Sequence, residues 1–122
     1  MRLVLFEDRW RDGSPAGFVL SRAGMPFERH RDPGETVHAV LVHTPDAIVW
    51  SLRPESEADL ATLRLIRLIA PEVALLIVEP DRTPLSRECR LELKPAFVGR
   101  LPADAASFFA VIDGLHAVTT AA

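Results

Sequence analysis

The sequence predicts an α/β fold in which helices cover both faces of a parallel sheet. Short runs of almost continuously apolar residues, typical of strands buried on both faces, alternate with segments whose apolar residues recur at helical spacing. Strands that alternate with helices pair in parallel through right-handed crossovers, which place helices on both sides of the sheet. The 122 residues fit one domain, which we expect to span 1–118, with 119–122 as a C-terminal tail.

Five segments are predicted to be strands. Val73–Val78 (VALLIV) carries the strongest signal, and Ala47–Leu52 (AIVWSL) is also nearly continuously apolar. Arg2–Phe6 is a shorter apolar run that ends at two acids. Met25–His30 and Phe97–Arg100 fit the second and the fifth strand along the chain.

Helices are predicted between these strands and after the last one. The expected helices span Pro15–Arg22, Thr36–His43, Glu57–Ile69 and Pro102–His116. Ser14 and Ser56 are expected N-caps, and Asp32-Pro33-Gly34 is expected to form a turn. Residues 79–94 are ambiguous, because PLSRECR fits one or two helical turns whereas CRLELK alternates like a strand.

Composition and charge exclude several classes of function. The net charge of −3 offers no global attraction to nucleic acid or to an anionic membrane. No apolar stretch approaches the roughly 18 residues of a membrane span, and the two acids after Arg2–Phe6 do not fit a secretory signal. Cys89 is the single cysteine, so neither an intrachain disulfide nor a cysteine-based zinc site is expected. We expect a cytoplasmic protein that neither enters a membrane nor binds nucleic acid directly.

A functional site is expected where the strands end. In open parallel sheets, ligands bind at the carboxyl ends of the strands, near the point where the strand order reverses. The residues that follow the expected strands are Glu7, Asp8, Ser51, Val78, Glu79 and Arg100.

Four segments follow, in order and spacing, the pattern of a known family. They are LVLFED, AGMPFERHRDPGETVHAVLVHTPDAIVWSL, EVALLIVEP and FVGRLPADAASFFAVI. Over nearly its whole length the chain resembles a bacterial response-regulator receiver domain. The resemblance implies a flavodoxin-like, three-layer α/β/α sandwich with a five-stranded parallel sheet in the order 2-1-3-4-5, and a role in bacterial signal transduction or transcriptional regulation.

The resemblance also implies that the phosphorylation site is degenerate. Glu7 and Asp8 match the acidic pair that holds Mg²⁺ in the family, because a hard cation requires oxygen ligands. Ser51 matches the aspartate that accepts the phosphoryl group; serine cannot form the acyl phosphate and supplies no carboxylate to the metal. Val78 matches the family's hydroxyl residue but has no hydroxyl, and Glu79 beside it would repel a phosphoryl anion.

Two residues compete for the position of the family's lysine. Lys94-Pro95 reproduces the family's Lys-Pro pair but leaves only Glu79–Leu93 for a helix and a strand. Arg100 is therefore favoured, although Leu101 rather than proline follows it. The aromatic switch position of the family matches Phe97.

No cofactor and no catalytic residue are expected. Glu7 and Asp8 are the weak candidates for a metal site; the favoured alternative is an acidic pair without metal, either solvated or paired to Arg100. Ser51 has no histidine evidently directed at it, so its hydroxyl is expected to satisfy local polar groups. His38 and His43 are five residues apart, which is poor spacing for one helical face.

The leading hypothesis is a pseudo-receiver that is not an enzyme. It would act without phosphorylation as a protein-interaction or dimerisation module, most simply as a homodimer with protein partners that the sequence does not name. Glu57–Ile69 is apolar around much of its circumference, which fits either a broad core contact or a partner surface. The alternative is a flavodoxin-like domain that binds or converts a small molecule at the strand ends.

Overall fold

The structure is a computed structural model that describes residues 1–7, 15–53, 57–80 and 84–121, with 119–121 as backbone only. These residues contain ten helices and strands. The strands are β1 (Leu3–Phe6), β2 (Glu28–His30), β3 (Ala47–Ser51), β4 (Ala74–Val78) and β5 (Phe97–Gly99). The helices are α1 (Pro15–Arg22), α2 (Pro33–His43), α3 (Glu57–Ile69), α4 (Arg87–Leu93) and α5 (Ala105–Ala121).

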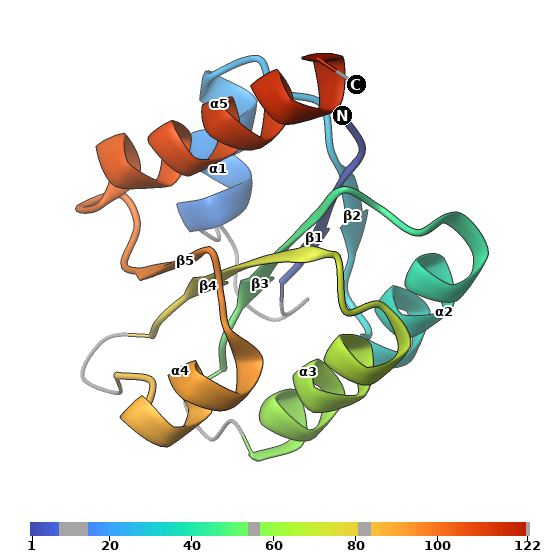
Figure 1. The fold of residues 1–122 in the computed structure, drawn as a ribbon. Helices are drawn as coiled ribbons and strands as arrows, with labels where there is room; N and C mark the ends of the chain where they lie inside the picture. Colours follow the sequence, from blue (N-terminus) through green and yellow to red (C-terminus); the bar gives the residue numbers. More distant parts are fainter. Residues whose placement is uncertain (8–14, 54–56, 81–83, 122) are drawn as a thin grey trace.

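All five strands pair in parallel, in the order β2-β1-β3-β4-β5 (Figure 1). Helices α1 and α5 cover one face of the sheet, and α2, α3 and α4 cover the other (Figure 1). The predicted fold class and strand order are confirmed. No helix within the described ranges is long and apolar enough to cross a membrane.

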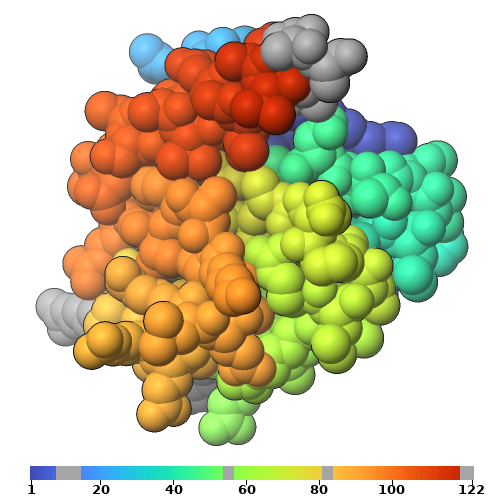
Figure 2. Space-filling model, viewed as in Figure 1, coloured from blue at the N-terminus to red at the C-terminus, as the bar shows by residue number. Residues whose placement is uncertain are grey.

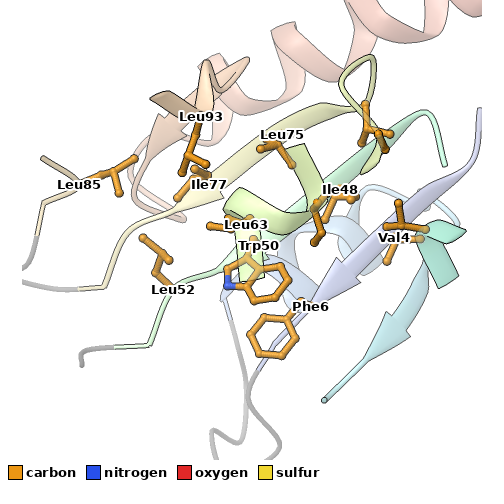
Figure 3. Close-up of a cluster of buried hydrophobic side chains, with 14 residues drawn as sticks. Val4, Phe6, Ile48, Trp50, Leu52, Leu63, Leu75, Ile77, Leu85 and Leu93 are labelled. Carbon is orange, nitrogen blue, oxygen red and sulfur yellow. The ribbon is translucent and has the colours of Figure 1, made fainter. Parts of the chain in front are cut away.

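The alternation of side chains along each strand divides the core into two halves. On the face toward α2, α3 and α4 the strands contribute Val4, Phe6, Ile48, Trp50, Leu75 and Ile77 (Figure 3). The residues between them face α1 and α5, where Phe108 and Ile112 are fully buried. Both faces of the central strands are therefore apolar, which explains why their sequences are almost continuously hydrophobic.

A stacked aromatic pair marks the centre of the first half of the core. Phe6 and Trp50 lie opposite each other on β1 and β3, and their ring centroids are 4.0 Å apart. Each is fully buried, and burial of such side chains contributes roughly 1.5–3 kcal/mol apiece. This packing fixes the carboxyl ends of β1 and β3 side by side.

Some predicted boundaries are wrong. Helix α2 begins at Pro33 rather than Thr36, because Asp32 is an N-cap: its Oδ1 accepts hydrogen bonds from Gly34 N at 2.7 Å and Glu35 N at 3.2 Å. Strand β2 is shorter than Met25–His30 and has exposed residues, as befits an edge strand.

The C-terminal helix also differs from its predicted range. Residues 101–104 form a turn, in which Asp104 N donates to Arg100 O at 2.7 Å, so α5 starts at Ala105 rather than Pro102. Its backbone remains helical to Ala121, beyond the predicted His116. The domain boundary after residue 118 stays a prediction.

The ambiguous segment 79–94 contains helix α4. Ser86 caps its start, with Oγ accepting from Cys89 N at 3.2 Å, and Lys94 ends it in the left-handed conformation with φ of 49°. Cys89 is half-buried against the core. The expected N-caps Ser14 and Ser56 lie outside the described residues.

Candidate functional site

Four of the predicted site residues lie along one edge of the sheet. Glu7 directly follows β1, Ser51 and Val78 end β3 and β4 opposite each other, and Arg100 directly follows β5. The parallel register therefore brings together residues that the sequence analysis predicted at the strand ends. Asp8 lies outside the described residues.

Glu7 is buried and bound to Arg29. Its Oε1 lies 2.6 Å from Arg29 Nε, and its side chain is only 6% exposed. This contradicts the predicted solvated state or pairing with Arg100, because β2 lies beside β1 and carries Arg29 to the Glu7 side chain. The guanidinium also stands 5.4 Å from the centre of the Phe27 ring.

Helix α1 closes over this ion pair at Gly17. A Cβ at this position would lie 2.7 Å from Arg29 Nη2 and 3.1 Å from Glu7 Oε2. Glycine thus allows the helix to approach the pair closely, whereas a Cβ at this position would force the Arg29 guanidinium to shift. Glu7 Oε2 is buried, with no hydrogen-bond partner among the described residues.

These side chains do not fit a Mg²⁺ site. One Glu7 oxygen is occupied by the Arg29 guanidinium, which already supplies the positive charge. Ser51 provides no carboxylate, and Mg²⁺ binds weakly where few protein oxygens are available. Within the described parts of the chain, no three His, Cys, Asp or Glu side chains converge as metal ligands would.

The loop after β3 is held by Asp59 of α3. This aspartate is fully buried; its Oδ2 accepts from Arg53 N at 3.0 Å and its Oδ1 from Arg53 Nε at 2.9 Å. Arg53 Nη2 also donates to Oδ1, and the guanidinium stands 5.5 Å from the centre of the Phe6 ring. Ser51, only 7% exposed, is therefore followed by a loop tied to the start of α3.

Glu79 holds the loop after β4. Its carboxylate accepts from Leu85 N and lies 3.8 Å from Arg90 Nη2 of α4. Its own N–H donates to Gly99 O at 2.8 Å. Glu79 is thus engaged with the segment that leads into α4, and Val78 beside it is buried.

Asp104 holds the loop after β5. Its Oδ2 accepts from Arg100 N at 2.7 Å, and the Arg100 side chain is exposed. Lys94 ends α4 before β5 begins and so lies at the opposite end of that strand from Arg100. Of the two candidates, only Arg100 stands at the carboxyl edge.

Phe97, which was predicted to match the family's aromatic switch position, is turned into the core. Phe97 is 7% exposed and packs edge-to-face on Phe108 of α5, with ring centroids 5.4 Å apart. Gly99 lies close to the Phe97 ring and to Asp104. A Cβ at position 99 would lie 2.7 Å from Phe97 Cζ and 2.8 Å from Asp104 Oδ2.

Three acidic residues therefore share one role that the sequence analysis did not assign. Each accepts a backbone N–H from the loop that follows a strand; we call them the loop-closing carboxylates: Asp59, Glu79 and Asp104. One signal was available for Asp59, which shares the buried stripe of α3 with Leu63 and Ile66. A charged residue on a buried helical stripe requires a partner.

Three hollows lie elsewhere on the described surface. One of about 490 Å³ lies between β2 and α2, and His30, His38 and His43 all line it. Two of about 270 Å³ lie at the amino ends of β1 and β2 and between α3 and α4. None of the three is lined by the four site residues at the carboxyl edge.

No protein-family model matches the sequence, and no curated protein matches it. Solved structures do resemble it. A CheY-like response-regulator receiver domain from Methanospirillum hungatei JF-1 has 14% identity and a TM-score of 0.72, over 99% of this chain and 98% of that one. The signal receiver domain of an HD domain-containing protein from Pseudomonas fluorescens Pf-5 has 11% identity and a TM-score of 0.73, over the same shares.

A further similar structure is the N-terminal domain of a response regulator/sensory box/GGDEF 3-domain protein from Carboxydothermus hydrogenoformans. It has 15% identity and a TM-score of 0.73, over 99% of this chain and 98% of that one. At such identities the likeness shows the fold: this chain has the flavodoxin-like fold of CheY-like receiver domains.

Proposed function

We propose that this domain is a phosphorylation-independent pseudo-receiver, an interaction module of bacterial signal transduction whose binding surface stays in one state. Its structural neighbours are receiver domains, which supports a signalling role. The domain binds other proteins through a surface complementary to theirs. One of these partners is a second copy of the chain.

The observation that carries this proposal is the set of loop-closing carboxylates. Each loop after β3, β4 and β5 is bound by an acid of the protein itself. A site that responds to phosphate needs loops that exchange contacts with water for contacts with the phosphoryl group. Here those contacts are intramolecular, and Arg29 replaces a cation beside Glu7.

A role as a ligand-binding or enzymatic flavodoxin-like domain has less support. Glu7 is paired and covered by α1 at Gly17, Val78 and Ser51 are buried, and Glu79 is engaged with α4. These contacts leave no activated nucleophile among the described residues of the carboxyl edge.

Exposure to a small phosphodonor tests the proposal. The wild type and Ser51→Asp are incubated with Mg²⁺ and acetyl phosphate, and their intact masses are then measured by mass spectrometry. We expect neither to gain a phosphoryl group in appreciable yield. Ser51→Asp restores only the nucleophile, whereas Glu7 stays paired to Arg29 and Val78 supplies no hydroxyl. Efficient labelling of either protein would contradict the proposal.

A further inference from the structure

Exposed apolar side chains are concentrated on one face of the domain. The large ones on the helices α2, α3 and α4 are Leu41, Val42, Leu65, Leu68, Ile69 and Leu91. Among the described residues, the only large apolar side chains that the opposite layer exposes are Phe18 and Val118. In Figure 2, where α5 lies at the top, α3 lies between α4 and α2. Such an uneven distribution is typical of a protein-binding surface.

Helix α3, at the centre of this face, carries a stripe with the spacing of a helix-pairing seam. Ala58, Ala61, Leu65 and Leu68 are exposed and follow each other at intervals of three, four and three residues. At 3.6 residues per turn they point away from the buried stripe that contains Leu63. We call these four residues the α3 stripe.

The α3 stripe is complementary to itself. Its amino-terminal half consists of two alanines and its carboxyl-terminal half of two leucines. When two such helices pair antiparallel about a two-fold axis, Leu65 of each lies over Ala61 of the other, and Leu68 over Ala58. Large side chains then fill the space that small ones leave, on both halves at once.

Charges beside the α3 stripe fit the same arrangement. Arg64 Nε lies 2.9 Å from Glu92 Oε1 of α4, and this hydrogen bond raises the pKa of the Arg64 guanidinium. Near the two-fold axis each protomer therefore presents one positive and one negative group. Their charges balance within a protomer, and Glu92 of one copy can face Arg64 of the other.

We propose that a second copy of this chain docks on the α2–α3–α4 face through antiparallel pairing of the α3 stripes. This inference rests on the proposed function as an interaction module and adds the surface, the partner and its orientation.

Sedimentation over a range of concentrations tests the surface. We expect the wild type to be a dimer, and Leu68→Glu to weaken dimerisation by more than about tenfold, because it places a charge in the apolar contact. Leu68 is 79% exposed, so the variant should fold, which circular dichroism checks. The matched control is Val118→Glu, 72% exposed on the other layer, which should remain dimeric.

Disulfide trapping tests the orientation, with Cys89→Ser in every protein. A mixture of Ala61→Cys and Leu65→Cys should form mixed disulfide dimers under mild oxidation, whereas Ala58→Cys alone should not. A dimer that Leu68→Glu leaves intact, or efficient Ala58→Cys dimers, would overturn the inference while leaving the proposed function in place. A wild type that is monomeric at every concentration would overturn the inference and the proposed self-association, whereas the phosphodonor experiment tests independence from phosphorylation.

Discussion

Arg29 is the residue that most changes the chemistry at Glu7, on the carboxyl edge of the sheet. It lies on the edge strand β2, its guanidinium is bound to Glu7, and its side chain remains 40% exposed. A buried carboxylate without a counter-charge is costly, so the pair stabilises the domain chiefly by preventing an unpaired charge. The same pair occupies one of the two Glu7 oxygens that a metal ion could bind.

Removal of Arg29 should show how much the Glu7–Arg29 pair contributes to the stability of the domain. We expect Arg29→Ala to lower the free energy of unfolding by about 1–3 kcal/mol, a value reduced from that of fully buried pairs because Arg29 is partly exposed. Glu7→Gln in the same protein should recover part of the loss, because a neutral amide costs less to bury. Urea denaturation measures both.

The control is Arg31→Ala, a change at an exposed arginine that follows β2, which should alter stability by no more than about 0.5 kcal/mol. Equal losses in Arg29→Ala and Arg31→Ala would show that the pair does not matter.

The sequence allowed Ser51, Val78 and Arg100 to be placed at the carboxyl edge, because their positions depend only on strand order and strand ends. It did not reveal the partner of Glu7. That partner depends on the register between β1 and β2 and on the close approach of α1 at Gly17, which no local pattern encodes.

At the scale of elements, acidic side chains hold described backbone groups in the loops at the carboxyl edge. Asp59 belongs to the first turn of α3 and binds the backbone of the preceding loop. Asp104 does the same immediately before α5. Asp59 and Asp104 thus each couple one loop to a helix start, whereas Glu79, directly after β4, binds the backbone just before α4.

Loss of one loop-closing carboxylate should loosen its own loop. We expect Asp59→Asn to cost about 1–3 kcal/mol, because the Arg53 guanidinium loses a charged partner. Amide hydrogen exchange should speed up at Arg53 and much less at Leu85 and Arg100, which other acids hold. Asp113→Asn, at an exposed position of α5, is the control and should change neither. Uniformly faster exchange at all three loops would contradict independent closure.

Element boundaries were less predictable than element types. Asp32-Pro33-Gly34 has turn composition, yet Asp32 caps α2 and Pro33 begins it. Residues 79–94 carry both helical and strand periodicity. The Ser86 cap, a local hydrogen bond, and the contacts of Glu79 with Leu85 and Arg90 favour helix α4. Local composition cannot distinguish a turn from a capped helix start when the same residues serve in both.

At the scale of the whole molecule, two regions matter for function: the carboxyl edge of the sheet and the α2–α3–α4 face. At the carboxyl edge of the sheet, Glu7 is bound to Arg29, and the loop-closing carboxylates bind the backbone after β3, β4 and β5. The α2–α3–α4 face carries most of the exposed apolar side chains. The fold was predictable because buried parallel strands leave a continuous apolar signal. The sequence left open whether the apolar residues of α3 pack in the core or face a partner, and the structure shows both a buried stripe and exposed leucines on this helix.

The most direct test of the central claim is an amide NMR titration of the wild type with Mg²⁺ and then with beryllofluoride, a mimic of the aspartyl phosphate. We expect no shifts at Glu7 and Ser51, since Glu7 is paired to Arg29 and Ser51 offers no carboxylate. Saturable shifts at these residues that spread to Phe97 and Arg100 would show that the edge still binds and responds, and would contradict it.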